Sequence, residues 1–195
     1  MKTQINNMKT FKFLFAYFLA STLLISCSND DDNPDPVNEE EVITTVRLTL
    51  TGGGSTVVFQ SQDLDGDGPD APVVTMTGSI TASTQYAGSV QFLNELESPA
   101  ENITTEVLEE DDEHQVFYGF SGSAGSTVTY TDMDDDGNPI GVNVSFNSGV
   151  ASTNNVLTVT LRHEPNKDAA GVSGGDISNA GGETDVAVTF SYDVN

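Results

Sequence analysis

The chain has few cysteines, histidines and positive charges and no tryptophan, and each shortage argues against a class of function. Its single cysteine, Cys27, cannot form an intramolecular disulfide. Two histidines and one cysteine provide few of the nitrogen and sulfur ligands that zinc sites use. The absence of tryptophan removes one kind of stacking platform, although ten Phe and five Tyr remain to build a core.

Acidic residues greatly outnumber basic residues. The chain has 30 Asp and Glu against six Lys and Arg, and three of these six lie in the first twelve residues. Beyond that segment only three cationic residues face the 30 acidic ones, a net charge of −27; they are Arg47, Arg162 and Lys167. Nucleic acids and anionic membrane surfaces would repel such a chain, so we expect no nucleic-acid partner. Divalent cations and basic partners remain compatible with it.

Motifs for covalent catalysis are also missing. The sequence has no Gly-x-Ser-x-Gly elbow, and no spacing suggests a Ser-His-Asp triad. His114 and His163 each stand beside a predicted connection, next to Glu113 and Glu164, which is typical of residues at strand ends. Carboxylates are abundant, but they fall in exposed polar runs where a raised pKa is not expected. The sequence therefore predicts a protein that is not an enzyme, with a hydrolase as the less favoured alternative.

Residues 1–26 have the pattern of a targeting segment. Lys2, Lys9 and Lys12 supply a positive start, and residues 13–25 form an apolar run. That run is too short to span a bilayer as a helix, and its length is typical of a signal-peptide core. We therefore interpret residues 1–26 as a signal peptide.

The signal segment ends in Leu24-Ile25-Ser26-Cys27, which resembles a bacterial lipobox. The resemblance implies cleavage before Cys27 and acylation of that residue. The chain would then have the membrane as a partner, through a lipid anchor at Cys27.

The residues after the cysteine, Ser28-Asn29-Asp30-Asp31-Asp32, resemble the surface-export signal of some Gram-negative lipoproteins. The resemblance implies a lipid-anchored protein of the outer membrane that is exposed at the cell surface. A merely soluble acidic tether is the alternative interpretation. Residues 27–41 contain two prolines and seven carboxylates with almost nothing apolar, and this composition predicts a disordered tether.

The chain as a whole resembles small bacterial surface lipoproteins, some of which carry the label "type 1 periplasmic binding fold". That label implies strands and helices that alternate over a longer chain. This sequence shows only one candidate helix, so its residues predict a different fold. The resemblance supplies no catalytic or binding residues.

Beyond the tether, apolar residues recur at every second position, which predicts strands. Four strands in meander order precede a long connection at 95–113, and the same order recurs before a second connection at 163–182. A ninth strand then closes the chain. We expect one all-β domain over residues 42–195, built of repeated units at about 43–112 and 113–195. Its antiparallel sheets should form a β-sandwich of two four-strand meanders plus the closing strand, with an up-and-down β-barrel as the alternative.

An acidic run, Asp-x-Asp-x-Asp-Gly, occurs twice at an offset of 69 residues and marks this repeat. Its aspartates are Asp63, Asp65 and Asp67 in the first copy and Asp132, Asp134 and Asp136 in the second. The run resembles the front half of the calcium loops of EF-hand, dockerin and thrombospondin-type repeats, which implies Ca²⁺ as its ligand. Val74 and Asn143 stand where an EF-hand has its bidentate Glu, so any calcium affinity would be weak. A solvated hairpin turn is the alternative, since Asp and Gly are common turn residues.

The meander order predicts that both acidic loops lie at the same end of the domain as the two long connections. In the first connection, Ser98 and Glu101 have capping-box spacing, which predicts a short helix over 99–109. Ile103 and Val107 would share one face of that helix.

Together these patterns predict a surface-exposed lipoprotein that acts without catalysis, as a calcium-stabilised binding or structural module. Its partner would be a protein or a glycan, and no residue pattern chooses between them. A small-ligand carrier with a cavity inside a β-barrel is the alternative from a different class.

Overall fold

The computed structural model describes residues 41–66 and 68–195. The predicted signal peptide, Cys27, the predicted tether up to residue 40, and Asp67 lie outside the described residues. In the described part of the chain, no helix has both the length and the apolar character that crossing a bilayer requires.

The described residues form nine strands, as the alternation predicts, because every second side chain is apolar and faces inward. In β1, for example, Val46, Leu48 and Leu50 are buried, whereas Arg47 and Thr49 between them are partly exposed. The strands are β1 (Thr45–Gly52), β2 (Ser55–Gln62), β3 (Val73–Thr77), β4 (Gln85–Leu93), β5 (His114–Ser121), β6 (Thr127–Tyr130), β7 (Asn143–Asn147), β8 (Ser152–His163) and β9 (Glu183–Val194). The helical segments are α2 (Ile103–Glu109), η1 (Val172–Gly174) and η2 (Ile177–Asn179).

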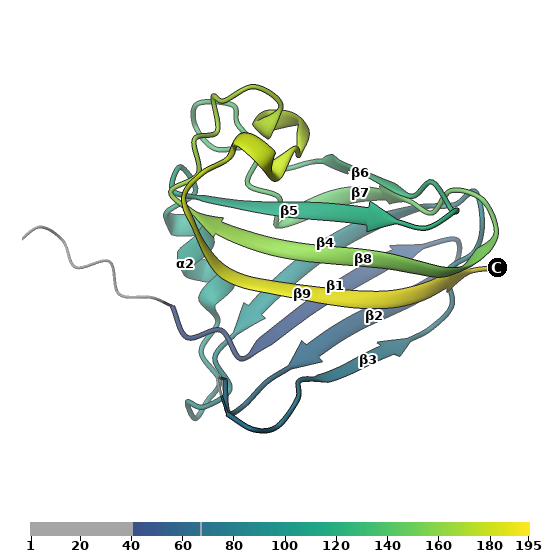
Figure 1. Ribbon diagram of the computed structural model, residues 1–195, viewed down its shortest axis with the longest axis horizontal. Coiled ribbons are helices and arrows are strands. Elements are labelled where there is room, and N and C mark those ends of the chain that lie inside the picture. Colours follow the sequence, from purple (N-terminus) through teal and green to yellow (C-terminus); the bar gives the residue numbers. More distant parts are fainter. Residues whose placement is uncertain (1–40, 67) are drawn as a thin grey trace, which may run out of the picture. The chain divides into compact units, whose positions relative to one another are not determined.

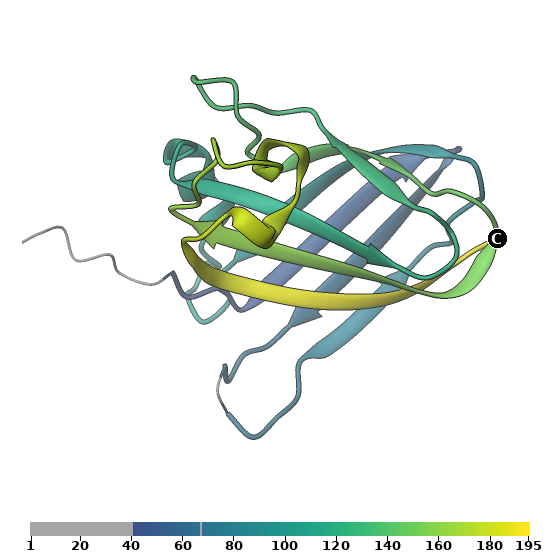
Figure 2. The same ribbon diagram turned by 45° about the horizontal axis from the view of Figure 1, so that its top comes forward.

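These strands form two antiparallel sheets that pack on one another. The larger sheet has the order β3-β2-β1-β4-β7-β6, and the smaller has the order β5-β8-β9. Figure 1 shows the smaller sheet lying across the larger one, and Figure 2 shows the same two layers after a turn about the horizontal axis. The predicted all-β antiparallel sandwich is confirmed, and the sheets do not close into a barrel.

The strand order differs from that of two separate meanders. The pairs β1–β4 and β2–β3 of the first unit recur as β5–β8 and β6–β7 in the second. The first four strands therefore have Greek-key order, but β5 and β6 lie in different sheets. Two hydrogen bonds hold the crossing between them, because Asn155 Oδ1 accepts the N–H of Ala124 at 3.0 Å and Ser126 Oγ donates to Ser148 O at 2.8 Å.

Aromatic side chains from both sheets fill the space between the layers. Phe59 of β2 packs against Phe190 and Tyr192 of β9, with ring centroids 5.3 and 6.0 Å apart. Within the larger sheet, Tyr86 of β4 packs against Phe146 of β7 at 6.0 Å. All five rings are buried, and burying one such side chain contributes about 1.5–3 kcal/mol to stability.

The long connections share one end of the sandwich, as the repeat predicts. Thr45, which begins β1, pairs with Gln62 at the end of β2 and with Leu93 at the end of β4. His114, which begins β5, likewise pairs with His163 at the end of β8. The two acidic loops nevertheless lie at opposite edges of the larger sheet, because β1 and β4 separate the hairpins that carry them. Four strand spacings put these hairpins roughly 19 Å apart.

The helix in the first connection starts later than predicted. α2 begins at Ile103, and the preceding Asn102 makes no side-chain cap, so the capping box at Ser98 does not form. Residues 95–100 are instead closed into a loop, because Asn94 and Glu101 exchange two backbone hydrogen bonds of 3.0 and 3.1 Å. The predicted apolar face is confirmed, since Ile103 and Val107 are both buried.

The packing between the sheets can be tested at Phe59. We expect Phe59→Ala to lower the free energy of unfolding by about 3–5 kcal/mol, because the ring leaves a cavity against Phe190 and Tyr192. Urea denaturation followed by circular dichroism would measure the change. Val150→Ala is the control, since Val150 is 58% exposed and its truncation should cost less than about 0.5 kcal/mol. Equal losses in the two variants would contradict this packing.

Candidate functional site

The first acidic loop, between β2 and β3, is organised as a turn. Asp63 Oδ1 accepts the backbone N–H groups of Asp65 and Gly66 at 3.3 and 3.0 Å. Asp65 is exposed, and its Oδ2 accepts the N–H of Asp70 at 3.2 Å. Asp67, the third predicted ligand, lies outside the described residues. The geometry fits a turn held by its own aspartates, and calcium binding at this loop stays a prediction.

In the second acidic loop, between β6 and β7, the aspartates also hold the backbone. Asp132 accepts the N–H of Gly141 at 2.9 Å with Oδ1 and the N–H of Asn143 at 2.7 Å with Oδ2. Asp134 Oδ1 accepts the N–H groups of Asn138 at 2.7 Å and of Asp136 at 3.1 Å. Calcium at this loop also stays a prediction, and it would have to compete with these hydrogen bonds.

A lysine gives the second loop a cation that the first loop does not share. Lys167 Nζ lies 2.9 Å from Asp134 Oδ2 and also donates to the backbone oxygen of Asp111. The two side chains are 5% and 2% exposed. Burial alone would raise the pKa of Asp134, but Lys167 and the N–H groups of Asn138 and Asp136 outweigh it and hold that pKa below its ordinary value. The ammonium group thus stands next to a carboxylate that the sequence predicts to bind calcium.

A second cluster of ionisable groups lies where β5 begins and β8 ends. His114 and His163 are direct partners in the β5–β8 ladder, and their ring centroids are 4.7 Å apart. Both are buried, at 0% and 8% exposure, because they continue the inward-facing positions of their strands. A bulge in β9 adds a carboxylate. Arg162 pairs with Thr184 and Leu161 with Val186, so Asp185 is the extra residue between them.

We call His114, His163, Asp185 and the nearby Glu41 the histidine–carboxylate cluster. One ligand atom from each of His114, His163 and Asp185 lies within 4.8 Å of the other two. Glu41, which precedes β1, meets the cluster through His114 alone: its Oε1 lies 3.7 Å from His114 Nε2, its side chain is 8% exposed, and with His114 and Glu110 it forms a second group within 4.8 Å. The cluster therefore joins three strands to the segment that enters the domain.

The cluster contains buried polar atoms without hydrogen-bond partners. Glu41 Oε2, His114 Nε2 and Asp185 Oδ2 are three of the four such side-chain atoms in the described residues, and the fourth belongs to Gln115. His114 Nδ1 lies 3.1 Å from the backbone oxygen of Glu110. Because a carbonyl oxygen can only accept, Nδ1 carries a proton, and Nε2 is the nitrogen that faces Glu41.

Burial raises the pKa of both carboxyl groups. Burial, together with the negative charges of Glu106, Asp185 and other acids, raises the pKa of Glu41 from 4.5 to about 7. Burial also raises the pKa of Asp185, although His114 and His163 oppose the shift. The cluster thus disfavours two bare carboxylates, which a bound cation or a shared proton would relieve.

The backbone around His163 leaves no room for another side chain. Gly182, just before β9, has a φ of +66°, and a Cβ atom there would lie 2.1 Å from the carbonyl oxygen of His163. On its other side, His163 Nε2 lies 3.6 Å from Glu113, whose side chain is 49% exposed. Close packing thus fixes the backbone of His163, while Glu113 leaves the cluster one side near solvent.

The two histidines, expected from the sequence to be separate strand-end residues, lie side by side in the structure. The alternation of the sequence already indicated that both histidines point inward, because His114 lies two residues before Val116 and His163 lies two residues after Leu161. What the sequence lacks is the pairing of β5 with β8 and the bulge at Asp185.

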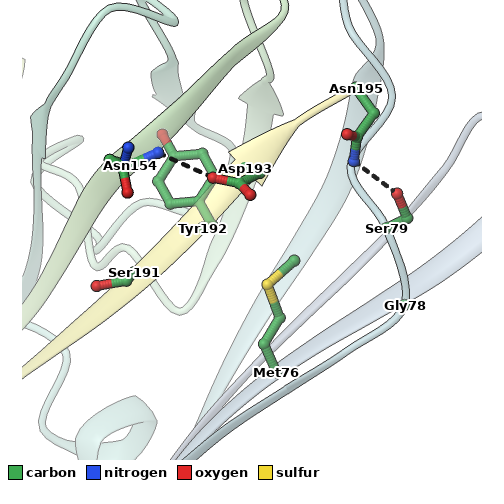
Figure 3. A pocket seen from close by; sticks show the side chains of 8 residues that line it. All are labelled: Met76, Gly78, Ser79, Asn154, Ser191, Tyr192, Asp193 and Asn195. Atoms are coloured by element: carbon green, nitrogen blue, oxygen red, sulfur yellow. Dashed lines mark hydrogen bonds between the residues drawn. The ribbon is translucent and has the colours of Figure 1, made fainter.

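A hollow lies at the other end of the domain. About 420 Å³ in volume, it opens between β3 and the end of β9. Figure 3 shows the Met76 side chain between these strands, with Asn195 Nδ2 donating to Ser79 Oγ at 3.1 Å. Asp193 Oδ1 accepts the N–H of Asn154 at 2.8 Å on the opposite wall. A second hollow of about 340 Å³ follows the same two strands past Phe59 and Phe190.

The three comparisons, with protein-family models, with curated proteins and with solved structures, give no match to this chain.

The Lys167–Asp134 pair gives a test of how the acidic end is held together. We expect Lys167→Met to lower the free energy of unfolding by about 3–5 kcal/mol at pH 7, because it leaves a buried carboxylate without its cation. Urea denaturation at several pH values would measure this. The pKa of Asp134 is lowered on folding, so the pair stabilises the protein above the ordinary pKa of 3.8. The difference between wild type and variant should therefore shrink as the pH falls below that value.

Arg47→Met is the matched control for this experiment. Arg47 is a partly exposed residue of β1 whose Nε donates to Gln60 at 2.9 Å. Its replacement should cost less than about 1 kcal/mol at any pH. A Lys167→Met loss as small as that of Arg47→Met would show that the ammonium does not hold the loop.

Proposed function

We propose that this chain is a non-enzymatic lipoprotein, anchored in the bacterial outer membrane through Cys27 and exposed at the cell surface, whose sandwich is a calcium-stabilised binding or structural module. The lipobox-like run before Cys27 and the acidic run after it support the location. The observation that carries the binding or structural role is the packed interior. Large side chains fill the space between the sheets, and the hollows described are open grooves at the β3–β9 side.

The charge of the chain fits a domain that stands away from the membrane. Thirteen residues lie between Cys27 and Glu41, so a fully extended tether would reach roughly 45 Å. A domain with so few cationic residues would be repelled by anionic lipid. The groove beside Met76 is the natural surface for a protein or glycan partner, because it is open and has amide, hydroxyl and carboxylate groups on its walls.

The alternatives have less support. A carrier with a barrel cavity requires a closed sheet, and the two sheets do not close. For a hydrolase, the sequence supplies no Gly-x-Ser-x-Gly elbow and no Ser-His-Asp spacing.

The lipid anchor can be tested in a Gram-negative host that expresses the full chain. Growth with an alkyne fatty acid should label the wild-type protein and leave Cys27→Ala unlabelled, because acylation requires that thiol. Protease added to intact cells should then degrade the wild type if it faces outward. Labelling of Cys27→Ala at the wild-type level would refute the anchor, and complete protection from protease would refute the surface location.

The calcium prediction can be tested by thermal melts of the full chain with millimolar calcium or with chelator. Calcium should raise the melting temperature with an affinity of roughly 10⁻⁴–10⁻³ M. Asp65→Asn and Asp136→Asn should each reduce that rise, because each removes a carboxylate from one acidic loop. Glu109→Gln is the control, since it removes an exposed carboxylate of α2 at the same end of the domain. Superimposed melts with and without calcium would identify the loops as solvated turns.

A further inference from the structure

We propose that His114, His163 and Asp185 bind a divalent transition-metal ion of the zinc class, with Glu41 as the fourth ligand. The ligands come from β5, β8, the bulge of β9 and the segment before β1. This site is separate from the two acidic loops and does not depend on the proposed calcium binding.

The donor atoms select the kind of ion. Two imidazole nitrogens and two carboxylate oxygens are a donor set that zinc accepts in tetrahedral geometry. Calcium instead prefers six to eight oxygen ligands, which the acidic loops resemble and this cluster does not. Two neutral imidazoles and two carboxylates around a divalent ion give a site with no net charge.

The second observation is the orientation of His114. Its Nδ1 donates to the backbone oxygen of Glu110, while its Nε2 is buried without a partner and faces Glu41. This is the arrangement found in metal-binding histidines, where a hydrogen bond at one ring nitrogen fixes the tautomer and directs the other nitrogen at the ion. The unpartnered oxygens of Glu41 and Asp185 belong to the same cluster. A cation bound by the three strand residues would satisfy His114 Nε2 and Asp185 Oδ2, and Glu41 would join it by moving from its place beside His114.

The spacing requires a contraction of the three strand residues and a larger movement of Glu41, which lies within 4.8 Å of His114 and Glu110. The ligand atoms of the three strand residues lie within 4.8 Å of one another, whereas bonds of about 2.0–2.1 Å place tetrahedral ligands about 3.3 Å apart. The two acids are suited to make this adjustment, because Glu41 precedes β1 and Asp185 stands in a bulge outside the regular ladder. The histidines are fixed by the ladder and by close packing at Gly182.

Such a site would fasten the entrance of the domain. Glu41 leads into β1 of the larger sheet, whereas the other three ligands belong to the smaller sheet. One ion would therefore link the two sheets at the point where the proposed tether meets the folded domain. Figure 1 shows the chain entering at the end that carries α2.

The test uses the full chain after removal of metal with a chelator. Titration with Zn²⁺ against a chromophoric competitor should give one ion per chain, and Co²⁺ should give the visible absorption of a tetrahedral complex. Asp185→Asn and His163→Gln are near-isosteric and should each weaken zinc binding at least tenfold. Asp65→Asn is the matched control and should leave zinc affinity unchanged, because it alters only the first acidic loop.

Histidine NMR gives an independent readout, because the chain has only two histidines to assign. On addition of zinc, the ¹⁵N signal of His114 Nε2 should shift strongly while Nδ1 keeps its proton. Absence of zinc binding would overturn the proposal and leave a proton shared among the acids as the explanation of the cluster. Zinc binding of equal strength in Asp185→Asn and His163→Gln would also overturn it, since the ion would then lie elsewhere. Neither result depends on whether Cys27 is acylated.

Discussion

The ladder between β5 and β8 determines most of what is distinctive in this structure. It places His114 opposite His163. The connection that follows β8 therefore leaves from the same end of the sandwich as the connection that leads into β5. Both edges of β8 are paired, with β5 and with β9, and the hairpin of β6 and β7 pairs with β4 in the larger sheet. A different partner for β5 would separate the two histidines. Fold and candidate metal site thus share one pairing.

Scarcity of positive charge makes the placement of each cation informative. Lys167 is buried with Asp134, whereas Arg47 donates to Gln60 and Arg162 donates to the backbone oxygen of Gly181. None of the three forms a salt bridge with Glu41 or Asp185 in the described chain. Asp134 therefore has a cation supplied by the protein itself. Glu41 and Asp185 would instead be neutralised by a proton or by an ion from outside.

Local patterns predicted the strands well and the sites poorly. Alternation identified the inward residues of β1 and the nine strands, because burial on one face imposes a period of two. It also put Ile103 and Val107 on one helical face, but the capping box at Ser98 failed because a backbone loop takes that segment. The Asp-x-Asp-x-Asp-Gly spacing predicted turns rich in carboxylates. It could not predict the contact with Lys167, which lies 33 residues from Asp134 in the sequence. Contacts between distant strands, and the extra residue at Asp185, leave no periodic signal.

The repeat contains an internal comparison for the histidine–carboxylate cluster. Thr45 begins β1 as His114 begins β5, and both stand at the end where the long connections leave. In the first unit the polar side chains at this position have hydrogen-bond partners, because Thr45 and Gln62 donate to Glu95 and lower the pKa of Glu95. In the second unit the equivalent position has a buried nitrogen with no partner. Since the pairing of the strands is the same, the unsatisfied atoms come from the side chains rather than from the fold. A ligand site requires buried atoms that are free to bind, whereas a strand end with only a structural role does not require them.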